Sequence, residues 1–323
     1  MKGTWLVVGL LLLIDGPFAA TFCQSAGRVS HDSDSTDLDK EAQPDNTAKE
    51  ATETTGAQVD VGTANPLKSK VDGTSIARPP RALSVASPSV PTSKNLSEKN
   101  QHFVAAIDVG HSKAQGGAVS ARGVFEYQFN RRLSGELLAV LRSSGFSHSF
   151  MINPDGADIR LTKRAETAND KHANVFLAIH HDSVKDRFLK DWTVGGKTEK
   201  FCDDFHGYSV FFSRKNVAPV RSRAFAIELG QALLAAGFTP TLHHIEQEHR
   251  PIIDPAKGVY AFDDLIVLKG ARMPAVLLEC GVIVNRAEEE KLNTAEYRNR
   301  LTNAIETAIQ QFADGQAAPI DSN

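Results

Sequence analysis

Two short runs of consecutive apolar residues limit most strongly how this chain can fold. They are VFLAI at residues 175–179 and AVLL at residues 275–278. Runs of this length without a polar residue are typical of central strands in a parallel sheet, because both faces of such a strand are buried. Pro274 precedes the second run, and proline is tolerated at the first position of a strand. The sequence therefore predicts a sheet that is covered on both faces.

Further strands and helices alternate around these runs. After Glu126, Leu133, Leu137 and Leu141 recur at helical spacing, which predicts a helix from residue 126 to about residue 143. The other expected elements are strands at 103–108, 149–152, 175–179, 208–213 and 275–279, and helices at 164–173, 221–236, 262–270 and 294–312. This alternation predicts an α/β fold: a single domain with a mostly parallel twisted sheet and helices on both faces.

The first hundred residues differ in composition from the rest. Residues 1–23 combine a charged start, an apolar stretch and small residues, which indicates a signal peptide rather than a buried helix, although its cleavage position is not defined. Residues 24–100 contain no aromatic residue and are rich in Ser, Thr and Pro, so they cannot bury enough apolar surface to fold. We expect a disordered linker at 24–100, a folded domain at 101–315 and a disordered tail at 316–323.

Charge and cysteine content narrow the classes of function. The net charge of −3 argues against a nucleic-acid-binding protein, which normally carries a basic stripe. The signal peptide predicts export to the periplasm, with no membrane insertion after cleavage, and we expect a monomer. Cys202 and Cys280 could form a disulfide in an oxidising compartment. Two separate buried thiols are the favoured alternative, because nothing in the sequence brings these cysteines together.

Four ionisable residues occur where such a sheet places its ligands. His111, His180 and Glu279 follow predicted strands, and Glu126 opens a helix. Ligands of open α/β sheets bind outside the carboxyl ends of the strands. Zinc hydrolases use three His, Glu or Asp ligands, leave one position for water, and use a separate carboxylate as general base. His111, Glu126 and His180 suit the ligand positions, and Glu279 suits the base.

Each of these residues also has an ordinary structural explanation. His111 can be a loop histidine, and Glu126 an acidic residue favoured in the first turn of a helix. His180 can be a polar residue at the end of a strand. Glu279 is the hardest to explain in this way, because a carboxylate directly after Ala-Val-Leu-Leu is expected to be buried and then needs a partner.

Five blocks of the sequence resemble the signature of one enzyme family. They are DVGHS (108–112), FEYQFN (125–130), RAETAND (164–170), FLAIHHDS (176–183) and MPAVLLECGVIVN (273–285). Together they are similar to the zinc-dependent N-acetylmuramoyl-L-alanine amidases of type 3, which act on the bacterial cell wall, and the resemblance spans residues 103–313. It implies one Zn²⁺ per chain, held by His111, Glu126 and His180, with Glu279 as catalytic acid and base. It also implies peptidoglycan as substrate, cleaved between N-acetylmuramic acid and L-alanine.

Four more residues of these blocks lie at positions near the site in the family. Arg164 and Asn169 match family positions, and we expect them either to be structural or to contact substrate, because arginine often pairs with a carboxylate. The resemblance gives no ligand role to His181 or Asp182. Asp182 is nevertheless suited to orient the imidazole of a neighbouring ligand.

The chain departs from the family pattern at a few positions, and alternatives to the amidase remain. Val109 and Ser112 stand where Pro and Gly are usual, and His181 where a smaller residue is frequent. One alternative is a zinc peptidase that acts on stem peptides. Another is a non-catalytic wall-binding module, against which the presence of all four chemical residues argues.

An insertion at residues 183–206 directly follows the His180 block. It carries Phe188, Trp192 and Phe201 among lysines and arginines. Such a segment suits a substrate-binding rim, or equally a solvated loop that its aromatic residues hold in place. Some family members cover the zinc with a helical plug that an activator moves, but the connection at 214–220, where such a plug would lie, is too short here. Whether an activator protein binds is left open.

Overall fold

The two apolar runs form the longest strands of a central sheet. In the computed structural model, which describes residues 100–245 and 249–316, the strands β3 (Val175–Asp182) and β9 (Ala275–Val282) are buried along their whole length. The predicted signal peptide, nearly all of the predicted linker and nearly all of the predicted tail lie outside the described residues. No helix in the described part of the chain is long and apolar enough to cross a membrane.

The remaining elements include the other predicted strands and helices, with further elements between them. In chain order they are β1 (Ala105–Val109), α2 (Glu126–Ser143), β2 (Phe150–Ile152), α3 (Leu161–Asp170), the 3₁₀ turn η2 (Asp186–Phe188), β4 (Lys190–Val194), β5 (Lys197–Phe201), β6 (Ser209–Phe212), α4 (Pro219–Ala235), β7 (Ile252–Asp254), the 3₁₀ turn η3 (Pro255–Lys257), β8 (Val259–Ala261), α5 (Ile266–Gly270), α6 (Arg286–Asn293) and α7 (Ala295–Gln316).

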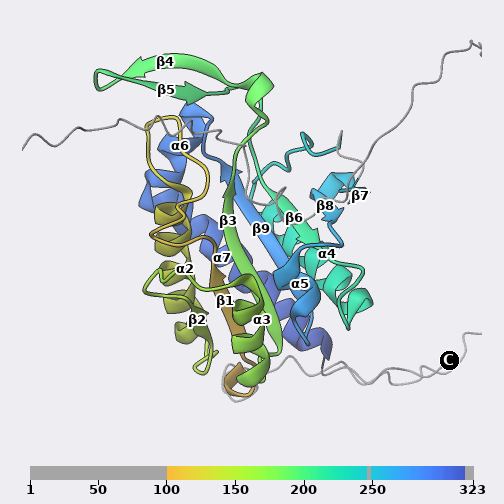
Figure 1. Ribbon diagram of the computed structural model, residues 1–323. Coiled ribbons are helices and arrows are strands. Elements are labelled where there is room, and N and C mark those ends of the chain that lie inside the picture. The colour runs from red at the N-terminus through yellow and green to blue at the C-terminus, as the bar shows by residue number, and fades with distance from the viewer. Residues whose placement is uncertain (1–99, 246–248, 317–323) are drawn as a thin grey trace, which may run out of the picture. The chain divides into compact units, whose positions relative to one another are not determined.

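Seven of the strands form one mixed sheet, in the order β2-β1-β3-β9-β6-β8-β7. The pairs β1–β2, β1–β3, β3–β9 and β6–β8 are parallel, whereas β6–β9 and β7–β8 are antiparallel. Figure 1 shows this sheet with β3 and β9 at its centre. The prediction of a mostly parallel sheet is confirmed.

Helices cover both faces of the sheet, as predicted. Side chains alternate along each strand, so Ile107 and Leu177 pack on the face covered by α2, α4 and α7. Their neighbours Ala106 and Phe176 pack on the opposite face, against α3 and α5. The two hydrophobic clusters together hold the central strands in place, and the ends of those strands are therefore fixed positions from which functional side chains can project.

Several boundaries differ from the prediction, for physical reasons. Strands β3 and β9 continue three residues further than expected, because polar residues such as His180 and Asp182 find partners and stay in the ladder. The helix predicted at 262–270 is wrong in its first half, since Phe262 follows strand β8 and only Ile266–Gly270 is helical. The helix predicted at 164–173 begins three residues earlier, at Leu161.

Besides the 3₁₀ turns η2 and η3, five elements were not predicted from the sequence: β4, β5, β7, β8 and α6. The helix α6 reads RAEEEKLN and has almost no apolar periodicity, but the Asn285 side chain caps its start by accepting hydrogen bonds from the backbone N–H groups of Ala287 and Glu288. The strands β7 and β8 have three residues each, too few for a pattern to emerge.

The insertion at 183–206 contains a β-hairpin, in which β4 pairs antiparallel with β5. Gly195 and Gly196 join the two strands with φ angles of 57° and 75°, as a two-residue type I′ turn requires. The hairpin lies beyond the end of β3 (Figure 1). The sequence did not predict it, because its strands are mostly exposed and carry charged residues on both faces.

The aromatic residues of this hairpin pack against the protein itself. The indole N–H of Trp192 donates a hydrogen bond to the carbonyl oxygen of Ala121 at 2.7 Å. The Arg286 guanidinium lies 3.9 Å from the ring centre of Phe201 and 5.1 Å from that of Trp192. For these two rings the structure agrees with the alternative in which aromatic residues hold the segment in place.

Cys202 and Cys280 are both buried and carry free thiols. Cys280 lies in the cluster beneath α2, α4 and α7, and Cys202 lies in a small separate cluster with Val184 and Val284. The prediction of two separate buried thiols is confirmed.

Candidate metal centre

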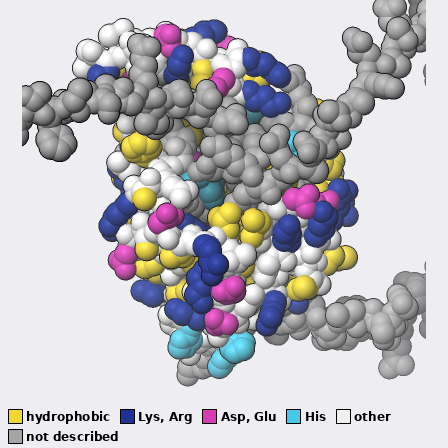
Figure 2. All heavy atoms as spheres, in the orientation of Figure 1, with side chains coloured by type: hydrophobic (Ala, Val, Ile, Leu, Met, Phe, Trp, Pro, Cys, Tyr) yellow, Lys and Arg dark blue, Asp and Glu magenta, His cyan; other side chains and the backbone are white. Residues whose placement is uncertain are grey.

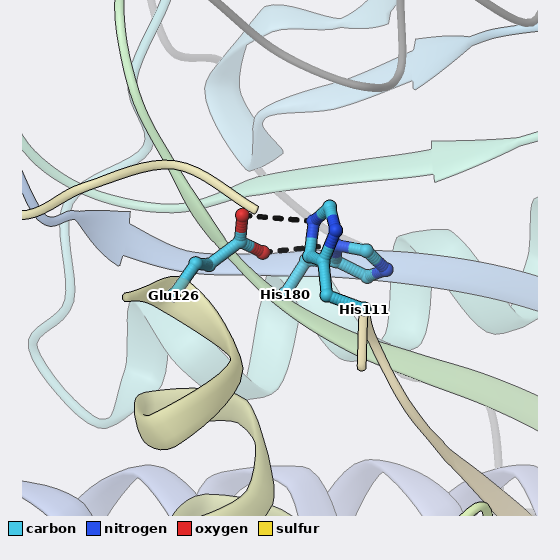
Figure 3. Close-up of side chains that lie close together, drawn as sticks. All are labelled: His111, Glu126 and His180. Carbon is cyan, nitrogen blue, oxygen red and sulfur yellow. Dashed lines mark hydrogen bonds and ion pairs between the residues drawn. The ribbon is translucent and has the colours of Figure 1, made fainter. Parts of the chain in front are cut away.

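Three elements bring His111, Glu126 and His180 together. His111 follows β1, Glu126 is the first residue of α2, and His180 lies near the end of β3. Figure 3 shows the Glu126 carboxylate facing both imidazole rings. Nε2 of His111 lies 2.9 Å from Oε2 of Glu126, and Nδ1 of His180 lies 3.0 Å from Oε1. The three side chains predicted as metal ligands therefore form one cluster.

Glu126 is the centre of this cluster. Besides the two histidines, its carboxylate accepts hydrogen bonds from the backbone N–H groups of His181 and Ala118 and from the side-chain amide of Asn130. Burial by itself raises the pKa of Glu126, but the charges and hydrogen bonds of the two histidines outweigh it and hold this pKa well below its usual range. Glu126 is therefore a carboxylate at neutral pH.

Two glycines leave room for the cluster. A Cβ atom at Gly110 would lie 2.4 Å from the ring of His180, and one at Gly117 would lie 2.5 Å from Oε2 of Glu126. Gly117 also has a φ of 74°, a conformation that residues with a side chain rarely adopt. The backbone thus approaches the side chains of His180 and Glu126 so closely that only glycine fits.

Arg164 holds the loop that carries His111. Its guanidinium pairs with Asp108 at 2.9 Å and donates hydrogen bonds to the carbonyl oxygens of Val109 and His111. His111 has a φ of 65°, which is uncommon for a residue other than glycine. These hydrogen bonds stabilise that conformation, so Arg164 orients His111 through the backbone, and Arg164 also lines the cavity beside it.

Asn169 and His181 also have defined partners. The Asn169 amide donates to the carbonyl oxygen of Gly270 and its oxygen accepts from the backbone N–H of Arg272, so this side chain ties α3 to the segment after α5. This contact agrees with the structural alternative for Asn169. Nδ1 of His181 lies 2.7 Å from the amide oxygen of Asn130. Burial lowers the pKa of His181 to about 3, so its ring is neutral.

Glu279 lies directly beside His180 in the sheet, because the two residues are register partners of β3 and β9. It is 1% exposed, and its Oε2 has no hydrogen-bond partner among the described residues. Burial raises its pKa well above the usual range, and the negative charges of Asp182 and Glu126 raise it further. The carboxylates of Asp182 and Glu126 thus lie close enough to Glu279 to favour its protonated form.

Asp182 does not pair with any of the three predicted ligands. Its carboxylate instead faces His243 and His244, from the segment between α4 and β7. Burial by itself would raise the pKa of Asp182, but the neighbouring histidines hold it well below its usual range. Burial lowers the pKa of His244 to about 4. Neither histidine was predicted from the sequence, although two adjacent histidines in a loop are a signal that could have identified them.

A cavity of about 680 Å³ opens beside the cluster. His111 and His180 line it, together with Leu277 from β9 and with Arg160 and Thr162 at the start of α3. Figure 2 shows histidine at the surface near the middle of this face, next to hydrophobic side chains. A molecule held in the cavity would therefore reach the two imidazoles.

The residues of the cluster fit a zinc ion. Two imidazole nitrogens and a carboxylate oxygen, all within 4.8 Å of one another, match the donor set of catalytic zinc sites. Each imidazole nitrogen that faces Glu126 is a position where a divalent cation can replace a proton. The buried carboxylate of Glu279, with one oxygen unpaired, also fits, because buried charges require a compensating charge nearby.

Comparison with known proteins agrees with the geometry. A family model described as N-acetylmuramoyl-L-alanine amidase matches residues 105–311, a range that includes the whole cluster and Glu279. A putative N-acetylmuramoyl-L-alanine amidase of Buchnera aphidicola subsp. Schizaphis graminum is 24% identical over 220 residues, which cover 64% of this chain and 94% of the relative. The probable N-acetylmuramoyl-L-alanine amidase AmiB of Haemophilus influenzae is 25% identical, and the match covers 65% of this chain but only 52% of AmiB.

Solved structures give the same fold. The N-acetylmuramyl-L-alanine amidase Ami1 from Mycobacterium smegmatis has a TM-score of 0.54 and 20% identity, and the match covers 67% of this chain and 98% of that one. An N-acetylmuramoyl-L-alanine amidase from Clostridium difficile 630 has a TM-score of 0.51 and 20% identity, with 67% and 98% covered. At this level of identity the likeness concerns the fold.

We expect Gly117→Ala to weaken zinc binding about tenfold or more, a loss typical of disturbed ligand orientation, because the added Cβ would displace Glu126. Competition titration against a chromophoric chelator measures this affinity. Gly135→Ala in α2 is the matched control, since nothing lies within 4 Å of its added Cβ. It should leave zinc affinity unchanged and stabilise the helix by about 1 kcal/mol. Equal zinc affinities for the two variants would contradict the prediction.

We expect Glu279→Gln to stabilise the zinc-free protein, increasingly so as the pH rises. Because the folded-state pKa of Glu279 is raised, folding favours its protonated form, and this contribution to stability is lost as the pH rises above the unfolded-state pKa. Glutamine stays neutral at every pH. Thermal unfolding in the presence of a chelator, from about pH 5 to about pH 8, should show a growing advantage of the variant. If the difference in thermal stability between the variant and the wild type were the same at every pH, ionisation of Glu279 would not destabilise the folded protein.

Proposed function

Because the chain belongs to the N-acetylmuramoyl-L-alanine amidase family, we propose that it is a zinc-dependent hydrolase of peptidoglycan. It cleaves the amide between N-acetylmuramic acid and the L-alanine of the stem peptide. The single observation that carries the zinc part of this proposal is the convergence of His111, Glu126 and His180 next to the buried carboxylate of Glu279. Zinc, when bound there, supplies the Lewis acidity that makes a water molecule acidic near neutral pH.

The residues around the metal ligands have distinct roles in this proposal. Glu279 takes a proton from the attacking water and later gives it to the nitrogen of the leaving amine. Arg164 and Asn130 touch the His111 loop and the Glu126 carboxylate respectively, and so keep the ligands oriented.

The cavity beside the cluster suits the substrate. It opens next to His111 and His180, so an amide bound at its inner end would lie near the ligands and Glu279. Its lining combines apolar side chains with the polar Gln115, Asp158 and Arg160, as a stem peptide with methyl groups and carboxylates requires.

The N-terminal segment bears on where the enzyme acts. Residues 1–23 have the features of a signal peptide, and peptidoglycan lies outside the cytoplasmic membrane. We therefore place the mature protein in the periplasm as a monomer. Its role there is cell-wall remodelling, turnover or the separation of daughter cells.

Variants of the cluster test the division of roles. His111→Ala and His180→Ala should lose both zinc and activity, because each removes a ligand. Glu279→Ala should keep zinc and lose activity about a hundredfold or more, since only the proton transfer is removed. Metal analysis and mass analysis of products released from purified sacculi measure both properties, with His148→Ala, an exposed histidine, as control.

Two results of that experiment would contradict the proposal in different ways. Loss of zinc from a folded Glu279→Ala protein would mean that Glu279 is a ligand and that its role is assigned wrongly. Products cut within the stem peptide, in place of intact stem peptides, would make the enzyme a peptidase.

Removal of residues 186–200 tests the function of the hairpin. If the hairpin forms a rim of the substrate site, the intact enzyme should cleave peptidoglycan without a partner, and the shortened enzyme should cleave it more slowly at equal thermal stability. The loss is expected because the hairpin lies beyond the end of β3, the strand that carries His180 (Figure 1). A shortened protein with higher activity would show instead that the segment covers the zinc.

A further inference from the structure

A second group of metal-ligating side chains lies at the end of β3. Asp182, the last residue of that strand, presents Oδ2 to two imidazoles. This oxygen lies 2.7 Å from Nε2 of His244 and 3.2 Å from Nε2 of His243. The three ligand atoms lie within 4.8 Å of one another. This group, which we call the Asp182 cluster, has the same composition as the first one: two imidazoles and one carboxylate.

The contact between His243 and Asp182 is incomplete as it stands. Nε2 of His243 is buried and has no hydrogen-bond partner among the described residues, although it lies 3.2 Å from a carboxylate oxygen. The other ring nitrogen, Nδ1, lies 2.9 Å from the hydroxyl of Thr241. If Nδ1–H donates to that hydroxyl, Nε2 is left with an unpaired lone pair beside a negatively charged oxygen, and a cation bound by both atoms would remove the repulsion.

The surroundings of the cluster suit a bound ion. The side chains of Asp182, His243 and His244 are 5% exposed or less. The second oxygen of Asp182, Oδ1, accepts a hydrogen bond from the backbone N–H of Ser183 at 2.8 Å, which fixes the carboxylate. Thr241 orients His243 in the manner of the outer partners that most metal-bound histidines have. The donors of a tetrahedral zinc ion lie roughly 3.3 Å apart, given bonds of about 2.0–2.1 Å. The 3.2 Å contact of His243 with Asp182 is close to this separation, and the 2.7 Å contact of His244 would have to widen.

The guanidinium of Arg250 carries a positive charge next to the Asp182 cluster, and a bound cation would add a second positive charge nearby. Its Nη1 lies 3.3 Å from Nδ1 of His244, and its guanidinium lies 4.4 Å from the ring centre of Phe262. A guanidinium can only donate, so without an ion it favours the His244 tautomer whose proton is on Nε2. An ion on Nε2 would move that proton to Nδ1 and break the contact with Arg250. The ring of Phe262 would still hold the guanidinium.

From these contacts we propose that Asp182, His243 and His244 bind a second divalent cation. Zinc is the favoured ion, because two imidazole nitrogens and one carboxylate oxygen match its donor preference. The carboxylate of Asp182 supplies a negative charge next to the ion. The chain then holds two ions, where the family resemblance implies one. The inference does not rest on the proposed amidase activity.

Zinc content of the purified full-length protein tests this site. After equilibration with Zn²⁺, the wild type should hold two equivalents per chain. His243→Ala and His111→Ala should each hold one, and the double variant none. His148→Ala, which replaces an exposed histidine, should still hold two. One equivalent in both the wild type and His243→Ala would overturn the proposal and make the Asp182 cluster a metal-free hydrogen-bonded network.

A gentler variant covers the case in which His243→Ala fails to fold. Thr241→Val keeps both imidazoles and removes only the hydroxyl beside His243, so it should weaken the second equivalent about tenfold or more and leave the first unchanged. Unchanged affinities for both equivalents would contradict the proposal. If the wild type held one ion that His243→Ala loses and His111→Ala keeps, the Asp182 cluster would be supported and the metal site of the proposed amidase would be the one that fails.

Discussion

The carboxylate of Glu126 is the interaction on which the arrangement of the site depends. It stands at the first residue of α2, buried, and contacts side chains that come from the ends of two parallel strands. The leucines of α2 pack against the same strands further along, so the helix cannot shift without moving the carboxylate. The helix N-terminus also favours a negative charge at this position. The packing of α2 in the core therefore also fixes the position of the Glu126 carboxylate between the two histidines.

Three buried carboxyl groups lie around this point. Glu126, Glu279 and Asp182 are all buried, and the negative charges of Glu126 and Asp182 raise the pKa of Glu279. Buried carboxylates without a compensating charge cost stability, and Glu279 responds by a raised pKa. Fixed dipoles and nearby histidines compensate Glu126 and Asp182. A cation bound in this region would therefore stabilise the fold, and the protein without a cation is less stable.

Much of the fold and of the site could be predicted from the sequence, because two strong signals coincide. Continuous apolar runs identified β3 and β9, and the polar residue after each run identified His180 and Glu279. The hairpin and α6 could not be predicted, since their stability comes from contacts such as Trp192 with Ala121 and not from a periodic pattern.

The histidines of the Asp182 cluster escaped prediction for a different reason. His243 and His244 lie about sixty residues from Asp182 and follow no strand, and only the return of the chain past β6 brings them to the end of β3. Contacts of this kind depend on the course of an irregular segment, for which local sequence carries little information. Asn130 is an intermediate case: it lies one helical turn after Glu126, so the spacing was visible but its partners were not.

The antiparallel placement of β6 has a consequence for how this architecture can vary. Strand β3 runs parallel to β9 and β6 runs antiparallel to it, so β3 ends and β6 begins at the same edge of the sheet. The segment that joins β3 to β6 therefore does not have to cross the face of the sheet, because it begins and ends at the same edge. Lengthening such a loop costs little, because the entropy lost on closing a loop grows only with the logarithm of the loop length. Evolution can therefore rebuild the chain between these strands, next to the ligands, while the seven-stranded framework stays the same.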